Sequence, residues 1–376
     1  MNFYLNINKL FIIFIILLYP LFVRYNFNSL NFNFLLNILF LFFSFLILKN
    51  QNLKLNNGVY FVTLFTCWML FVLFNSIYNG FQISNFDTYK DPLFAINEMA
   101  ETAENYYSIG DYSHNIKYML RMIIFIPLGY FVGSSIKNVN PNFIIKFFWF
   151  FLIIAFVKLI IDFYNEGFER LSGIYNNPQD MSAILLFNLA VVLSISKIKF
   201  SIIIYILITS ISIYLTGTRS SLIVLILMLF LKNRTKIFLI ISVFSLVFVS
   251  YVLPNLIDFL YGVEFTSISS SVVRLRLWVD YLWPHIFEKF FVGNGTIPVV
   301  TENLLLFLLY VYGFVGTCIF LTFLLLHEKN KNYGSKLLVS VFILQSTYFM
   351  GLLSLDNIVI TFFWFGYLSQ KYRYYA

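Results

Sequence analysis

Charge is scarce in this sequence, and so are histidine and cysteine. Only 11% of the 376 residues are Asp, Glu, Lys or Arg, and the chain holds three histidines and two cysteines. A soluble domain usually carries about 25% charged residues. Here 60% of the residues are hydrophobic, and the mean hydropathy is +0.83. No soluble fold could bury so much apolar surface, so we expect residues 1–376 to form a single membrane domain.

The few potential metal ligands do not suggest a metal site. His114, His285 and His327 are scattered and lack ligand spacing, so we expect no metal. Cys67 and Cys318 lie within apolar runs, where we expect buried, small hydrophobic side chains and no disulfide. The chain also lacks a P-loop, a Rossmann glycine pattern and an HExxH motif. These absences argue against a cofactor and against ATP-driven transport.

Long apolar runs make up most of the chain. A membrane-spanning helix needs about 20 apolar residues. Measured against that length, the sequence predicts an all-α polytopic membrane protein with about 12 transmembrane helices. The predicted runs are 9–23, 29–48, 58–79, 115–135, 143–163, 180–196, 200–216, 219–231, 237–253, 303–326, 337–354 and 356–370.

Positive charge is segregated to one side of these predicted helices. The net charge is +8, but no basic run is long enough to predict nucleic-acid binding. With a cytoplasmic N-terminus, the inner loops hold 13 Lys and Arg residues and a single acid, Glu328. The outer side receives the loop 80–114, with six acids against Lys90, and the large loop 254–301 between the ninth and tenth helices. This positive-inside pattern predicts that both termini are cytoplasmic.

Lys and Arg are depleted on the outer side, and four arginines stand out there: Arg170, Arg219, Arg274 and Arg276. Arg219 lies in a turn of small polar residues, and only 32 residues separate Lys199 from Lys232 around it. Two full spans would need about 40 residues. We therefore expect this hairpin to be too short to reach the outer surface, which places Arg219 in a recess.

Arginine suits a phosphate-bearing ligand, but each arginine also has a structural interpretation. The planar guanidinium donates paired hydrogen bonds to phosphate oxygens and stays charged. Arg170 could instead pair with a neighbouring glutamate, and Arg276 could pair with Asp280 at i+4. Arg274 has no obvious acid beside it and is the better ligand candidate. Lys158 and Asp162, within an apolar run, could also pair at i+4.

The outer loops contain three motifs in a characteristic order. They are the segment 170–178 (RLSGIYNNP), the turn 218–221 (TRSS), and Arg274 and Trp278 leading to Gly293-Asn294-Gly295. In this order the motifs resemble the O-antigen polymerase and O-antigen ligase superfamily, over about residues 165–325. The resemblance implies a GT-C-like membrane glycosyltransferase of the bacterial inner membrane. It also implies a substrate of oligosaccharide repeat units on undecaprenyl pyrophosphate, used at the periplasmic face without a metal or a nucleotide sugar.

One position departs from the ligase pattern. Where ligases show histidine before asparagine, this chain has Thr301-Glu302-Asn303. Glu302 could replace the histidine as general base, because partial desolvation can raise the pKa of a carboxyl group. It could equally be an acid favoured by a helix N-terminus. The missing histidine favours the polymerase, the Wzy type, over the ligase.

The resemblance therefore implies a specific set of roles. Arg170, Arg219, Arg274 and Arg276 would bind the pyrophosphates, and Glu302, Arg219 and Arg274 would be catalytic. The expected partners are the lipid bilayer, the lipid-linked oligosaccharide and a polysaccharide chain-length regulator. The rival interpretations are an O-antigen ligase, a lipid-linked oligosaccharide flippase and a small-molecule permease. The long outer loop 254–301 argues against the flippase.

Overall fold

The structure is a computed structural model, and the account below concerns the residues that it describes. These are residues 2–22, 26–27, 30–49, 57–79, 112–136, 139–167, 171–175, 177–196, 199–252, 278, 282–295, 303–329, 333–348, 350–353 and 357–370.

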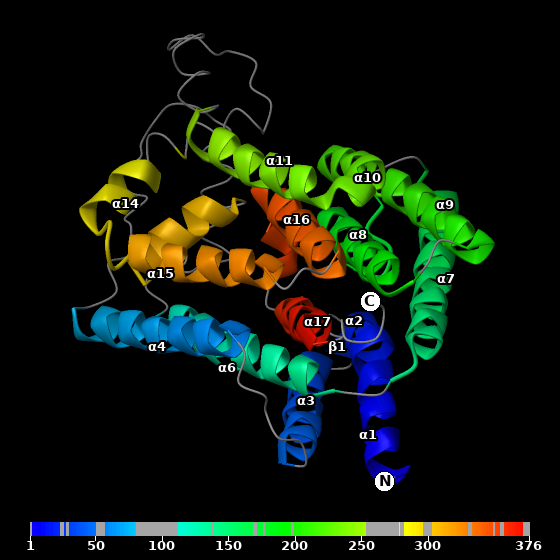
Figure 1. Cartoon of the computed structure of the whole chain (residues 1–376), viewed down its shortest axis with the longest axis horizontal. Coiled ribbons are helices and arrows are strands. Elements are labelled where there is room, and N and C mark those ends of the chain that lie inside the picture. The colour runs from blue at the N-terminus through cyan, green and yellow to red at the C-terminus, as the bar shows by residue number, and fades with distance from the viewer. Residues whose placement is uncertain are drawn as a thin grey trace.

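Helices form almost all of this described part (Figure 1). The first half contains α1 (Asn2–Ile13), η1 (Phe14–Leu18), α2 (Tyr19–Phe22), α3 (Phe32–Lys49), α4 (Asn57–Tyr78), α6 (Tyr112–Ser135) and α7 (Pro141–Glu166). The second half contains α8 (Pro178–Ile195), α9 (Phe200–Leu215), α10 (Arg219–Leu231), η3 (Lys232–Arg234), α11 (Thr235–Val247), η4 (Phe248–Val252), α14 (Trp283–Glu288), α15 (Leu304–Lys329), α16 (Tyr333–Tyr348), η6 (Met350–Leu353) and α17 (Ile358–Gln370). Two short strands, β1 (Asn26–Phe27) and β2 (Leu30–Asn31), pair antiparallel.

Each of the twelve predicted apolar runs overlaps described helix, although the run 29–48 includes strand β2 before α3 begins. Five helices are long and apolar enough to cross a membrane: they cover 57–78, 116–135, 141–165, 178–195 and 304–325. Seven further apolar helices of 10–17 residues cover the remaining runs. The prediction of a helical polytopic membrane protein is confirmed, while the number of 12 membrane crossings stays a prediction.

Asparagine followed by proline starts two of the long helices. The side-chain oxygen of Asn140 accepts the amide of Asn142 at 2.9 Å at the start of α7, and that of Asn177 accepts the amide of Gln179 at 2.9 Å at the start of α8. Proline is the next residue in both cases, where its missing N–H costs nothing and its fixed φ suits a helix. These caps set the starts of α7 and α8.

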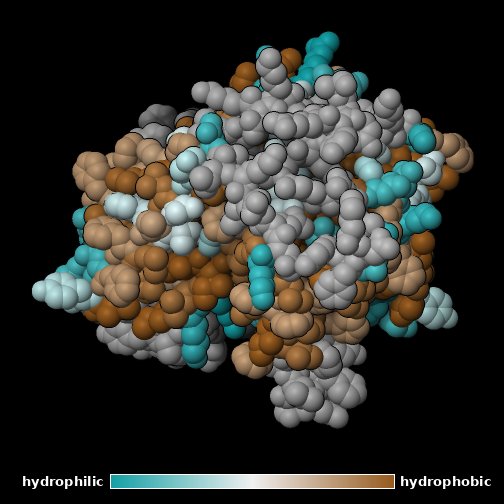
Figure 2. All heavy atoms as spheres, turned by 60° about the horizontal axis from the view of Figure 1, so that its bottom comes forward, coloured by the Kyte–Doolittle hydropathy of each residue, from teal (hydrophilic) through white to brown (hydrophobic). Residues whose placement is uncertain are grey.

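The outside of the helical bundle is apolar, as expected for contact with lipid. Phe200, Phe230 and Phe244 are exposed by 78%, 83% and 67%. Figure 2 shows hydrophobic residues over much of the described surface on the face that it draws. A water-soluble protein rarely exposes apolar patches of such extent. The surface therefore agrees with a membrane-embedded chain.

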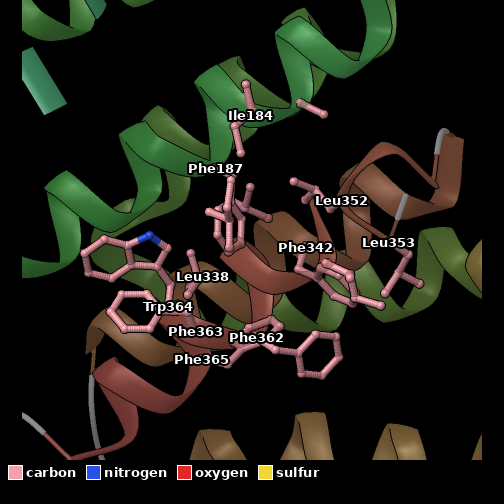
Figure 3. Packing of buried hydrophobic residues seen from close by; sticks show 14 of the residues in the cluster. Ile184, Phe187, Leu338, Phe342, Leu352, Leu353, Phe362, Phe363, Trp364 and Phe365 are labelled. Carbon is pink, nitrogen blue, oxygen red and sulfur yellow. The ribbon is translucent and has the colours of Figure 1, made fainter. Parts of the chain in front are cut away.

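The centre of the bundle is built around α17, near the middle of the view in Figure 1. Every residue from Asn357 to Leu368 is buried. Phe362, Trp364 and Phe365 pack with side chains of α8 and α16, as Figure 3 shows. This apolar centre holds together helices from both halves of the chain.

Glycine allows α17 to lie directly against α6. A Cβ at Gly133 would collide with the Phe363 carbonyl and would lie 2.8 Å from the Tyr367 nitrogen. A Cβ at Gly366 would collide with the Tyr130 carbonyl in return. Small residues at such contacts let two backbones approach closely, a common way for helices to associate in membranes.

The two cysteines differ from the prediction. Cys67 on α4 and Cys318 on α15 are free, but both are exposed on the outside of the bundle and not buried. An apolar run alone does not show which face of a helix meets other helices and which meets lipid. The prediction of buried cysteines was therefore wrong.

Candidate functional site

The turn before Arg219 joins two short helices. α9 has 16 residues and α10 has 13, which makes them roughly 24 Å and 20 Å long at 1.5 Å per residue. Both are shorter than a hydrocarbon core of about 30 Å. The lengths agree with the expected short hairpin, while the depth of Arg219 in the membrane stays a prediction.

The turn is anchored by buried hydroxyls and presents the arginine outward. Thr216 and Thr218 are buried, and their Oγ1 atoms lie 2.7 Å apart. Gly217 makes the turn with a φ of 65°. The Arg219 side chain is exposed, and within the described part of the chain it has no hydrogen-bond or ion-pair partner. The turn thus fixes the backbone position from which the Arg219 side chain extends.

A buried polar cluster includes Ser221 of α10, two residues after Arg219. The Ser221 Oγ lies 2.8 Å from the Ser182 Oγ of α8, and it accepts a hydrogen bond of 3.0 Å from the Gln345 Nε2 of α16. All three side chains are buried. Because buried polar groups are costly unless they are hydrogen-bonded, this cluster holds the beginnings of α8 and α10 against α16.

Asn303 makes a second buried polar junction at the start of α15. Its Oδ1 accepts the Leu305 amide at 2.9 Å, which caps the helix, and it also accepts the Ser250 hydroxyl at 2.9 Å. Its Nδ2 donates to the Thr347 carbonyl at 3.1 Å. Asn303 therefore ties α15 to η4, which follows α11, and to the end of α16. Glu302 is its neighbour in sequence and lies outside the described residues.

The end of α16 connects these two junctions. Gln345, which contacts Ser221, and Thr347, which contacts Asn303, are two residues apart. That separation corresponds to roughly 3 Å along a helix axis. Ser221 and Asn303 therefore meet the same end of the same helix.

Asp180 is a buried carboxylate at this end of the bundle that the sequence interpretation missed. It lies in the first turn of α8, two residues before Ser182, and is 4% exposed. Contact between Ser182 and Ser221 also brings the beginnings of α8 and α10 together. Helix N-termini favour negative charge. Asp180 could have been noticed as the first acid after an asparagine-proline helix start.

The segment that follows Arg170 is anchored to α17. The Tyr175 hydroxyl donates to the Asn357 Oδ1 at 3.3 Å, and both residues are buried. Leu171 is buried too, and Gly173 turns the chain with a φ of 62°. Arg170 itself lies outside the described residues, next in sequence to Leu171.

The structure describes only one of the predicted site residues. Arg219 is described, whereas Arg170, Arg274, Arg276 and Glu302 lie outside the described residues. The same holds for nearly all of the predicted outer loop 80–114 and most of 254–301. Their roles in binding or catalysis stay predictions.

The predicted pair within α7 is confirmed. The Lys158 Nζ donates to the Asp162 Oδ1, in the i,i+4 relation expected from the sequence. The Lys158 side chain is 47% exposed and that of Asp162 is 7% exposed. The carboxylate is thereby neutralised inside an apolar helix, which supports a structural role for this pair.

No group of three or more His, Cys, Asp or Glu side chains that could hold a metal ion occurs among the residues that the structure describes. Comparison with known proteins adds no identity: no protein-family model, no curated protein and no solved structure matches the chain.

Proposed function

We propose that this chain is a polymerase of the Wzy type that joins oligosaccharide repeat units carried on undecaprenyl pyrophosphate. In this proposal about 12 helices cross the bacterial inner membrane, both termini are cytoplasmic, and the chain has a GT-C-like architecture. The reaction takes place at the periplasmic face. The proposed substrate class comes from the resemblance of the loop motifs to the O-antigen polymerase and O-antigen ligase superfamily.

One structural observation supports the proposal most directly. The end of α16 contacts both Ser221, two residues after Arg219, and Asn303, the residue after Glu302. Two residues from distant parts of the sequence, each close in the chain to a candidate residue, thereby meet at one end of α16. An acceptor-activating base and a pyrophosphate-binding arginine need such proximity to act on one substrate pair.

The reaction needs only groups that this chain can supply. An acceptor hydroxyl on one lipid-linked unit attacks the anomeric carbon of the growing glycan and loses its proton to the Glu302 carboxylate. The bond between that carbon and the pyrophosphate breaks, and undecaprenyl pyrophosphate leaves with the electron pair. Arg170, Arg219, Arg274 and Arg276 bind the pyrophosphates and stabilise the charge that develops on the leaving group.

Alanine substitution of the outer arginines tests this function. In a strain without its own polymerase, R170A, R219A and R274A should each convert a ladder of polymerised lipopolysaccharide into single-unit caps, because the leaving group loses a cationic partner. Arg234 is an exposed arginine of the opposite, cytoplasmic end in the predicted topology, so R234A should retain the ladder. A full ladder from all three outer variants contradicts the proposal.

The ligase is the second candidate, since it shares the loop motifs. Loss of a ligase leaves the glycan on its lipid carrier, whereas loss of a polymerase leaves single-unit caps. The observation that favours the polymerase is Glu302 in place of the ligase histidine. An E302H variant that retains the ladder would fit a base at this position, while an E302A variant with full activity would exclude it.

A further inference from the structure

Helix α15 is broken where a segment of the preceding outer loop meets it. Gly313, inside α15, has a φ of 67° and a ψ of −176°, far from helical values. Residues 290–295, which follow α14, lie against this break. The segment, like the break, contains glycines with positive φ: Gly293 and Gly295 have φ values of 84° and 66°.

The segment replaces the two helical hydrogen bonds that the break removes. In an unbroken helix the amides of Phe314 and Val315 would bond to the carbonyls of Tyr310 and Val311. Here the Phe314 amide donates to the Phe290 carbonyl at 2.7 Å, and the Val315 amide donates to the Phe291 carbonyl at 3.3 Å. The two freed carbonyls accept the Asn294 amide at 2.7 Å and the Gly295 amide at 3.0 Å.

Three further backbone carbonyls at the break also have partners. The Tyr312 carbonyl accepts the Trp68 Nε1 from α4 at 2.8 Å, and the Gly313 carbonyl accepts the Thr317 hydroxyl at 2.7 Å. In the segment 290–295, the Asn294 carbonyl accepts a hydrogen bond of 3.3 Å from the Ser76 hydroxyl of α4. Irregular backbone within a membrane is tolerated only when its polar groups are satisfied by protein or water. The break meets this condition with protein groups.

Only glycine fits at the three turning points. A Cβ at Gly293 would collide with the Gly313 amide, and a Cβ at Gly313 would lie 2.5 Å from the Phe291 carbonyl oxygen. A Cβ at Gly295 would collide with the Ser76 side chain. Positive φ adds a cost of roughly 1 kcal/mol for any other residue. Glycine at these positions thus follows from close contact as well as from backbone conformation.

The contact lies deep within the helix. Gly313 is nine residues beyond Leu304, the start of α15, which is roughly 14 Å along the axis at 1.5 Å per residue. That depth is about half of a hydrocarbon core of about 30 Å. The chain returns from there to Asn303 at the beginning of the same helix. A segment that enters and leaves on one side is re-entrant.

We propose that residues 283–295 form a re-entrant segment clamped into the break of α15, and that this clamp positions the substrate-binding residues of the outer loop. The second half of the proposal rests on the proposed function, because Arg274 and Arg276 precede the segment and Glu302 follows it. The clamp acts by position: the amides of Asn294 and Gly295 and the carbonyls of residues 310–313 are occupied by protein partners and are not available to a substrate.

Amide hydrogen exchange on the purified chain in lipid nanodiscs tests the clamp without reference to activity. The amides of Asn294 and Gly295 should exchange about 100-fold or more slowly than in an unstructured peptide, because each donates to α15. In a G313A variant the protection should be lost. Rapid exchange of both amides in the wild-type chain would overturn the clamp.

Lipopolysaccharide ladders test the positioning role. G293A, G295A and G313A should each produce mostly single-unit caps. Gly167 also has a positive φ, of 78°, but a Cβ added there would meet nothing within 4 Å. G167A should therefore retain the ladder. This control separates the cost of backbone conformation from the loss of the clamp.

A second substitution should rescue one variant specifically. Because the Cβ of G295A collides with the Ser76 side chain, S76G in the same chain should restore at least part of the ladder. S76G should leave G313A inactive. A merely structural defect elsewhere would not respond to a change on α4, and failure of this rescue would contradict the contact.

The outcomes separate the two proposals. If the wild-type chain restores no ladder while its amides are protected, the proposed function and the positioning role fail and the clamp stands. If the amides are protected from exchange in the wild type, and this protection is lost in a G313A variant that still makes a full ladder, only the positioning role fails.

Discussion

Two regions of the bundle use glycine in different ways. At the α6–α17 contact, Gly133 and Gly366 lie in regular helices and are needed only because the backbones are so close. At the break of α15, Gly293 and Gly313 are needed for closeness and also for a positive φ. The first contact depends on close packing of two helices, whereas the second also depends on hydrogen bonds exchanged between segments.

This comparison separates general stability from the organisation of the proposed site. The α6–α17 contact lies in the apolar centre, and damage to it should lower stability and reduce activity only through protein abundance. The polar junctions at the ends of α8, α10, α15 and α16 carry the candidate residues, so damage there should lower activity beyond the loss of stability. Three sets of substitutions test this distinction.

The largest effect on stability is expected at the apolar contact. G133V should lower the free energy of unfolding by about 3 kcal/mol, because the new side chain collides with α17. Thermal stability of the detergent-solubilised chain, followed by size-exclusion chromatography, measures this change. Leu120 on the same helix is exposed, so L120V should have little effect. Equal stability of the two variants would disprove the close contact.

A smaller effect on stability, but a larger one on activity per folded molecule, is expected at Asn303. N303A should cost about 2 kcal/mol through the lost helix cap and the lost buried hydrogen bonds. Ladder formation, normalised to the amount of folded protein, should also fall because α15 begins beside Glu302. S250A removes only one of these contacts and should show a weaker form of both effects. Full activity of N303A per folded molecule would remove the distinction between the two regions.

The smallest effect is expected at the ion pair of α7. Replacing both partners in K158M/D162L should change the free energy of unfolding by no more than about 1 kcal/mol, because the desolvation of the pair is removed together with its attraction. K158M alone should be worse, since it leaves the buried Asp162 unpaired. Thermal stability and ladder formation of the three proteins measure this. Loss of the ladder in the stable double variant would assign this pair a functional role.

Much of the secondary structure could be predicted because a single physical requirement acts on each segment by itself. Apolar runs such as 143–163 and 180–196 must satisfy their own backbone hydrogen bonds in lipid, so they become helices α7 and α8. The spacing of Lys199 and Lys232 likewise predicted a short α9–α10 hairpin around Arg219. The pairing of Lys158 with Asp162 followed from helical periodicity alone.

Contacts between distant segments were not predictable in the same way. The Gly129-x-x-x-Gly133 spacing was a visible signal for close helix packing, but it did not identify α17 as the partner. Gly293-Asn294-Gly295 was visible as a motif, while its insertion at Gly313 was not. The exposure of Cys67 shows the same limit, since an apolar run does not reveal which side faces lipid.

The sequence by itself determined that this chain is helical and membrane-embedded, because composition and run length depend on each segment alone. Only the tertiary structure decided which helix ends meet: the end of α16 contacts Ser221 and Asn303, which are 82 residues apart in the chain. It also decided that α15 is interrupted, because the hydrogen bonds that permit the break come from another segment. Partners of this kind are set by packing in three dimensions, which local sequence does not encode.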